Sequence, residues 1–262
     1  MENKSVLITG GTCGIGLGLA RLFAKDNYRV LIAARSEAEL TRTKALLEQE
    51  GARDVITIPC DLFDPKAAES LYQAVKGKGI DIDVLVNNAG QGQYGLFAES
   101  DLARLLSIMQ LNNSSLVSLT YYFIQDFIRK GNGKILNLSS VAAKAPGPWQ
   151  AVYHATKAFV HSFTEALRSE VKEHGITVTA LLPGATRTDF FNKAHMMSSK
   201  ITQDMSKLAD PADVAKDGYT ALMNGDDMVI SGWDNKIQVA VGNLTPDENL
   251  ADYTRDKQSP VK

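Results

Sequence analysis

The sequence predicts an α/β protein: one Rossmann-like, doubly wound parallel sheet of about seven strands, with helices on both faces. Short apolar runs alternate with longer helical patterns along the 262 residues, and a glycine-rich turn directly follows the first run. Near-continuous apolar strands joined by helices are typical of a parallel sheet that is covered on both faces. Right-handed crossovers would then place a ligand at the carboxyl ends of the strands.

Each expected element comes from its own apolar pattern. The strands are expected at residues 6–9, 29–34, 55–59, 84–87, 133–138, 177–182 and 228–231. The helices are expected near residues 16–26, 37–50, 65–76, 100–111, 116–130, 153–174 and 211–223. No linker or internal repeat divides the chain, so residues 1–244 are interpreted as a single domain. Residues 245–262 form a polar tail that we expect to be loosely ordered.

Composition argues against several classes of function. Lys and Arg total 28 against 30 Asp and Glu, so no basic field points to nucleic acid or to an anionic membrane. No apolar stretch approaches the ~20 residues of a membrane span, and a cytoplasmic location is expected. The two cysteines, Cys13 and Cys60, form neither a disulfide framework nor a metal-ligand cluster, so no metal is expected.

The glycine-rich turn is the first motif with a chemical meaning. It consists of Gly10, Gly11, Thr12, Cys13, Gly14, Ile15 and Gly16. Glycines allow backbone N–H groups to approach the phosphates of a dinucleotide, and a helix N-terminus supplies partial positive charge. The spacing differs from the G-x-G-x-x-G of the general dinucleotide fingerprint. The motif therefore gains its meaning from its position between a strand and a helix.

A second motif pairs Tyr153 with Lys157, and Ser140 stands thirteen residues before the tyrosine. Positions i and i+4 share one face of a helix, so the phenol and the ammonium can converge. A phenol titrates near ~10, and a neighbouring cation favours the phenolate. The alternative for this pair alone is an ordinary amphipathic helix with a half-buried tyrosine and a solvated lysine.

These motifs, with Asn87-Asn88-Ala89-Gly90, Asn112 and Pro183-Gly184, together resemble the short-chain dehydrogenase/reductase family in its single-domain type. The resemblance covers residues 4–232, with the motifs in the family's order and at its intervals. It implies the strand order 3-2-1-4-5-6-7, a small-molecule carbonyl or alcohol substrate, and a homodimer or homotetramer.

Arg35 directly follows the second expected strand, after Ala33 and Ala34. An acidic residue there would bind a ribose 2′-hydroxyl, whereas a guanidinium suits a 2′-phosphate. The sequence therefore favours NADP(H), with a solvated surface arginine as the alternative. One departure is Cys13, which stands where many NADP-preferring relatives carry a second basic residue. The resemblance adds these cofactor contacts: Asp61, Leu62, Asn88, Ala89, Gly90, Tyr153, Lys157, Pro183, Gly184, Thr186 and Thr188.

The resemblance also implies the chemistry. Tyr153 would donate a proton to the substrate oxygen, and Lys157 would lower the pKa of the tyrosine and bind the nicotinamide ribose. Ser140 would orient the carbonyl, and Asn112 would hold a water in a proton relay. His154 is not expected to be catalytic, because adjacent helix positions face different ways.

Three segments are expected to line the substrate pocket: 91–97, 143–152 and 189–206, the last as a lid. Their apolar members include Tyr94, Trp149, Phe190, Met196 and Met197. Such side chains predict a neutral, fairly hydrophobic ketone or aldehyde. Fatty-acid-cycle ketoreductases fit less well, because their glycine-rich ending differs from Ser231-Gly-Trp-Asp234. Two alternatives stay open: a noncatalytic NADP-sensing or scaffolding protein, and an epimerase or dehydratase that uses the same Tyr–Lys pair.

Overall fold

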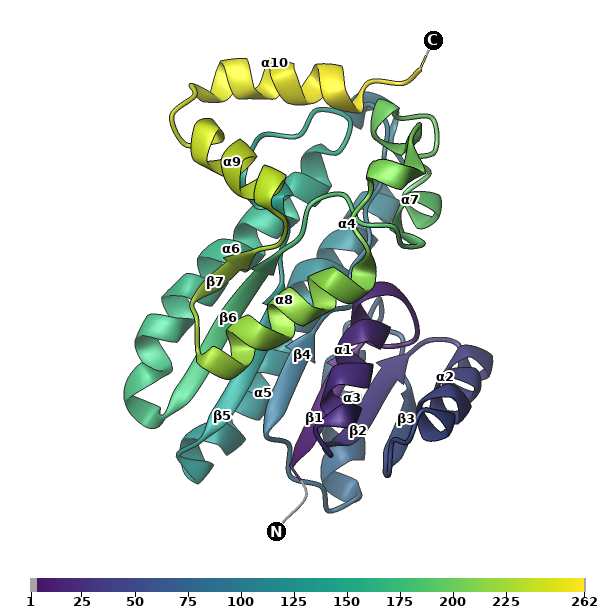
Figure 1. The fold of residues 1–262 in the computed structure, drawn as a ribbon, viewed down its shortest axis with the longest axis vertical. Helices are drawn as coiled ribbons and strands as arrows, with labels where there is room; N and C mark the ends of the chain where they lie inside the picture. Colours follow the sequence, from purple (N-terminus) through teal and green to yellow (C-terminus); the bar gives the residue numbers. More distant parts are fainter. Residues whose placement is uncertain (1–3, 262) are drawn as a thin grey trace.

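The computed structural model describes residues 4–261 and confirms the predicted fold (Figure 1). One seven-stranded sheet has the order β3-β2-β1-β4-β5-β6-β7, and each neighbouring pair is parallel. Its strands are β1 (Ser5–Thr9), β2 (Arg29–Ala34), β3 (Val55–Pro59), β4 (Val84–Asn87), β5 (Gly133–Leu138), β6 (Ile176–Leu182) and β7 (Met228–Ile230).

Helices cover both faces of the sheet. They are α1 (Gly14–Lys25), α2 (Glu37–Gln49), α3 (Ala67–Gly77), α4 (Leu102–Met109), α5 (Ser115–Lys130), α6 (Ala151–Val171), α7 (Phe190–Lys193), α8 (Pro211–Asn224), α9 (Trp233–Gly242) and α10 (Asp247–Gln258). Buried side chains of α1, α2 and α8 form the core on one face, and those of α3 and α5 form the core on the other.

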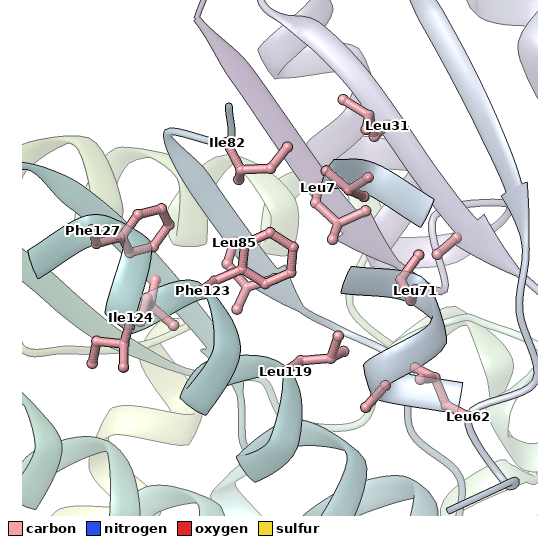
Figure 2. Close-up of a cluster of buried hydrophobic side chains, with 14 of the residues drawn as sticks. Leu7, Leu31, Leu62, Leu71, Ile82, Leu85, Leu119, Phe123, Ile124 and Phe127 are labelled. Atoms are coloured by element: carbon pink, nitrogen blue, oxygen red, sulfur yellow. The ribbon is translucent and has the colours of Figure 1, made fainter. Parts of the chain in front are cut away.

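The alternation of side chains along β1 explains why the two cores are separate. Leu7 packs in one core with Leu71 and Phe123, as Figure 2 shows. Its neighbours Val6 and Ile8 belong to the other core. Because successive strand residues point to opposite faces, a strand that is buried on both faces must be apolar throughout. All five residues of β1 are indeed buried.

The helices expected at 100–111 and 116–130 are α4 and α5, which a π-helical turn, Gln110–Ser114, connects. Asn112 lies in this turn and is 2% exposed. Such π turns often occur at functional sites. The sequence predicted a break between two helices here, because Asn112, Asn113 and Ser114 interrupt the apolar pattern, and it did not reveal the π turn.

The C-terminal segment differs from expectation. Instead of a loosely ordered tail, residues 247–258 form α10, which Figure 1 shows lying across the end of the molecule beside α9 and α7. Its first turn contains Asp247 and Glu248, and its last turn contains Arg255 and Lys257. This charge distribution suits the dipole of a helix. The strongly polar composition concealed that signal.

Within residues 4–261 no helix combines the length and the apolar character that a membrane crossing requires.

Candidate active site

A large cavity of about 1450 Å³ lies at the carboxyl ends of the strands. Residues that follow β1, β2, β3, β4, β5 and β6 contribute to its lining, from Gly10 near one end of the chain to Gln258 near the other. This is where a doubly wound parallel sheet places its ligand.

The glycine turn forms one end of the cavity. Gly10 and Gly14 have φ angles of 66° and 55°, a left-handed conformation that side chains rarely adopt. Cys13 occupies the N-cap of α1 without a side-chain hydrogen bond, so the first N–H groups of this helix remain available to an anion. Thr12, Cys13 and Ile15 also line the cavity.

Gly16, by contrast, does not line the cavity. A Cβ there would lie 2.4 Å from the Gly10 carbonyl oxygen and 2.5 Å from Asn88 Nδ2. The glycine is therefore required because α1 packs closely against the turn. Asn88 supports the same turn: its Nδ2 donates to the carbonyls of Thr9 and Gly10, both at 2.9 Å. Asn88, Ala89 and Gly90 all line the cavity as predicted.

Arg35 lies at the expected adenosine end, where Asp61 and Leu62 also line the cavity. Its guanidinium stacks over the Phe63 ring at 5.1 Å, and Arg104 lies 5.6 Å from the same ring. Sequence reasoning missed both neighbours, because neither belongs to a motif.

It also missed Glu39, a cavity residue in the first turn of α2. The Thr12 hydroxyl donates to Glu39 Oε2 at 3.4 Å. A carboxylate is therefore present at this end, although none stands directly beside Arg35 in the sequence.

Tyr153, Lys157 and Ser140 line the same cavity, as their spacing predicted. Tyr153 and Lys157 are one turn apart in α6, and Lys157 Nζ lies 5.8 Å from the centroid of the Tyr153 ring. Ser140 follows β5; its Oγ donates to the Pro183 carbonyl at 3.3 Å and accepts from the Ala142 N–H at 3.1 Å. Two elements, α6 and the end of β5, thus bring the three groups together.

Burial shifts the pKa of both titratable groups. It raises the pKa of Tyr153 to about 12, against a smaller lowering effect of the Ser140 hydroxyl. It lowers the pKa of Lys157 to about 8. We expected the lysine to lower the pKa of the tyrosine, but burial raises this pKa, and the lowering effect comes from Ser140. At neutral pH the phenol therefore carries its proton.

Asn112, which is expected to hold a water in a proton relay, does not line the cavity. Its Oδ1 accepts from the Gln91 N–H at 3.0 Å, and its Nδ2 donates to the Gln91 carbonyl and to Thr156 Oγ1 at 2.9 and 3.0 Å. A Cβ on Gly90 would lie 3.3 Å from this Oδ1 and 3.4 Å from Lys157 Nζ. Asn112 therefore fixes the loop after β4 against α6.

Pro183, Gly184, Thr186 and Thr188 follow β6 and all line the cavity; the sequence predicts them as the nicotinamide contacts. Thr188 also packs on the glycine turn: a Cβ on Gly14 would lie 2.8 Å from its methyl group. The loop is thereby held close to the N-terminus of α1.

Of the five predicted substrate-pocket residues, Phe190 and Met196 line the cavity. The Phe190 ring lies 5.0 Å from the Tyr153 ring. Tyr94 and Trp149 stack on each other at 5.7 Å outside it, and Met197 is 48% exposed and does not line it. Each of the three expected segments contributes residues to the cavity, but sequence alone does not show which side chains within a loop point inward.

The C-terminal helices complete the cavity, which sequence reasoning missed. Their contributing residues are Asn235, Gln238, Tyr253, Thr254, Asp256, Lys257 and Gln258. Segment 196–208 joins them: Lys200 N–H donates to the Ser259 carbonyl at 3.1 Å, and Val261 N–H donates to the Ser198 carbonyl at 2.8 Å. The expected lid is therefore attached to the C-terminus.

His154 also lines the cavity, although it is next to Tyr153 in α6. Its Nδ1 lies 2.8 Å from the Ala145 carbonyl oxygen, and its Nε2 lies 3.0 Å from Gln258 Nε2. It connects α6 to the loop 145–150 and to α10.

The residues fit a bound dinucleotide. The left-handed glycines leave room for phosphates, the α1 N-terminus offers uncapped N–H groups, and a guanidinium lies at the far end. Among residues 4–261 no cluster of His, Cys, Asp or Glu suits a metal ion. Fold and site together define a Rossmann-like protein of the dinucleotide-binding class.

Comparison with known proteins identifies the family. The chain matches the short chain dehydrogenase family over residues 4–198. It is 29% identical to the ketoacyl reductase HetN of Nostoc sp., over 94% of this chain and 86% of that protein. It is 36% identical to sulfoacetaldehyde reductase 2 of Chromohalobacter salexigens, over 71% and 73%. A short-chain dehydrogenase from Sphingobium yanoikuyae in complex with NADPH has a TM-score of 0.81 at 27% identity, covering 92% of this chain and 93% of that one. The chain therefore belongs to the short-chain dehydrogenase family of oxidoreductases.

Proposed function

We propose that this protein is an NADP(H)-dependent carbonyl reductase that converts a ketone or aldehyde to the alcohol. One observation carries the proposal: a single cavity connects the glycine turn and Arg35 to Tyr153, Lys157 and Ser140. The dinucleotide, when bound, supplies the hydride. Both relatives named above are reductases whose names denote carbonyl substrates, which supports this direction.

Tyr153 is the general acid in this proposal. Burial raises the pKa of its phenol to about 12, so the proton is present at neutral pH, ready for transfer from Oη to the developing alkoxide. Ser140 Oγ, which is held between the Ala142 N–H and the Pro183 carbonyl, orients the substrate oxygen. Lys157 places a cation beside the tyrosine, and this stabilises the phenolate that remains after transfer.

The preference for NADP(H) rests on Arg35. A guanidinium at the end of β2 suits a 2′-phosphate, and the Phe63 ring holds it in place at 5.1 Å. Glu39 is the competing group, because its carboxylate could accept from a 2′-hydroxyl. Its contact with Thr12 directs it toward the glycine turn.

The substrate wall favours a largely hydrophobic carbonyl compound. Phe190, Phe191, Met196, Ile201 and Leu208 all line this part of the cavity, and all five belong to one apolar cluster with Tyr94 and Trp149. Adaptable apolar walls of this kind suit substrates with a bulky hydrocarbon part.

The test is oxidation of NADPH by the purified protein with a panel of aliphatic, cyclic and aromatic ketones and aldehydes, and with NADH in parallel. We expect turnover of several hydrophobic ketones, faster with NADPH. The reverse reaction of the product alcohols with NADP⁺ is the control for direction. Absence of turnover with every carbonyl and both dinucleotides would refute the proposal.

A further inference from the structure

The substrate cavity contains two buried carboxamides with unpaired atoms. Gln150, just before α6, and Gln258, at the end of α10, are 4% and 6% exposed, and both line the cavity. Within residues 4–261, Gln150 Nε2 and Gln258 Oε1 have no hydrogen-bond partner. Buried polar atoms in proteins are nearly always paired, so an unpaired atom beside a cavity needs an explanation. A bound substrate can supply the missing partner.

The protonation of His154 determines which atom of Gln258 is free. His154 Nδ1 lies 2.8 Å from the Ala145 carbonyl oxygen. Because a carbonyl can only accept, Nδ1 carries the proton. Burial lowers the pKa of His154, so the imidazole is neutral and its Nε2 is an acceptor. Gln258 must therefore donate its Nε2–H to this atom at 3.0 Å, and its Oε1 becomes the free acceptor.

Gln258 is held firmly in this position. Its backbone carbonyl accepts from Tyr94 Oη at 2.5 Å and from Ser199 Oγ at 3.0 Å. His154 is equally constrained, because a Cβ on Gly147 would lie 2.1 Å from its ring. Preorganised polar groups of this kind lose little entropy when they bind a ligand.

We propose that Gln258 is a specificity-determining residue whose Oε1 binds a hydrogen-bond donor, a hydroxyl or an amide N–H, on the carbonyl substrate. This inference rests on the proposed function. His154 contacts Gln258 at 3.0 Å, and the centroids of the His154 and Tyr153 rings are 6.1 Å apart. A substrate whose carbonyl oxygen faces Tyr153 can therefore place its donor group near Gln258, next to the His154 imidazole.

The chemistry favours a substrate that is apolar except for its carbonyl group and one donor. The apolar cluster around Phe191 and Met196 receives the hydrocarbon part, and Gln258 recognises the donor. A site built to bind a hydroxyl discriminates strongly against an analogue that lacks it, because the protein's own polar atom then stays unpaired.

The experiment compares kcat/KM for three ketones of similar size that carry a hydroxyl, a methyl group or a methyl ether at the same position. The comparison is repeated with the substituent placed at increasing distances from the carbonyl group. At one of these distances we expect kcat/KM for the hydroxyl compound to exceed that for the methyl compound at least about tenfold. The ether can accept but cannot donate, so it should be no better than the methyl compound. If the wild-type protein reduces all three equally, or prefers the ether as much as the alcohol, the inference is wrong.

Three variants assign the effect to Gln258. Gln258→Met keeps the length but removes the acceptor, so the hydroxyl preference should fall to about one, while the methyl compound is still reduced. Gln258→Glu keeps an acceptor; beside the carboxylate His154 takes up a proton and donates its Nε2–H in place of the lost amide donor, so the preference should be retained. Gln238→Met is the matched control, because this carboxamide already accepts from Lys257 Nζ at 3.5 Å in the same cavity; it should retain the preference.

Persistence of the hydroxyl preference in Gln258→Met would overturn the assignment. If Gln258→Met does not fold, as judged by circular dichroism, the comparison of hydroxyl and ether in the wild-type protein decides the question. The proposed function fails separately, when the wild-type protein reduces no ketone of the series at all.

Discussion

Lys157 Nζ donates a hydrogen bond of 2.7 Å to the backbone carbonyl of Leu138, the last residue of β5. A second bond runs in the opposite direction, from Ser139 Oγ to the Lys157 carbonyl at 2.9 Å. Because Ser140 follows directly and Tyr153 lies one turn before Lys157, these two bonds hold the serine and the tyrosine in fixed relation. Lys157 therefore holds the site together through these bonds and also supplies its positive charge.

Tyr153→Phe should abolish most hydride transfer. The change keeps the ring but removes the proton donor, and general acid catalysis typically contributes ~10²–10⁴ in rate. The measurement is single-turnover oxidation of NADPH at saturating cofactor. Tyr121→Phe, at an exposed tyrosine of α5, is the matched control and should keep the wild-type rate. Retention of more than about a tenth of the rate in Tyr153→Phe would refute this role.

Lys157→Met should change the pH dependence of stability. Burial lowers the pKa of Lys157 to about 8 in the folded protein, whereas the ordinary pKa of a lysine is 10.5. Between these pH values the unfolded chain binds more protons, so this group makes the free energy of unfolding rise with pH. A pKa shift of that size corresponds to a rise of roughly 3 kcal/mol in the free energy of unfolding. The Lys157→Met variant should lack this rise.

Denaturant titrations of the cofactor-free protein from neutral pH to about pH 10 measure this effect. The wild-type protein should gain stability relative to Lys157→Met as the pH rises. Lys172→Met, at an exposed lysine just after α6, is the control. Parallel curves for wild type and Lys157→Met would show that the ammonium is not desolvated.

Arg35→Ala should weaken NADP binding about ten- to a hundredfold, because a charge-assisted contact worth roughly 1.5–3 kcal/mol is lost. NAD binding should barely change. Glu39→Gln is the matched control at the same end of the cavity and should not weaken NADP binding. Isothermal calorimetry provides the affinities. The assignment is incorrect if the wild-type protein binds NAD more tightly than NADP.

The lid should become ordered on binding. Residues 189–206 consist of short helical turns and loops, so we expect them to exchange amide hydrogens faster than the sheet in the free protein. Because Lys200 and Val261 bond the lid to the C-terminal segment, α10 should gain protection together with it. Hydrogen exchange with and without NADPH and substrate tests this. Equally strong protection in both states would rule out a moving lid.

The protein should associate through α5 and α6. Tyr121 on α5 and Phe159 on α6 are 62% and 46% exposed, and a twofold interface would bring each helix against its copy. Light scattering at micromolar concentration should show a dimer or tetramer, and Phe159→Glu should shift it toward the monomer. A wild-type species of only 28.4 kDa would contradict the prediction.

The strand order and the role of Ser140 were predicted from the family resemblance, whereas the residues themselves predicted the sheet and the convergence of Tyr153 and Lys157. These features depend on local patterns: apolar runs that are buried on both faces, a glycine turn between strand and helix, and a four-residue spacing that the helical period converts into a shared face. Such patterns act within one strand, turn or helix, so they can be recognised before the long-range contacts are known.

The partners and the environment of the remaining groups depend on contacts between distant parts of the chain. Asn112 turns its carboxamide to Gln91 and Thr156, and burial raises the pKa of Tyr153. The polar segment after Leu244 becomes a wall of the cavity. Gln258 in this segment contacts His154, which lies 104 positions earlier in the sequence. No periodic pattern in the sequence predicts a contact over that separation. Side-chain partners and desolvation depend on what the fold packs beside each group, so they follow from the complete chain rather than from any segment.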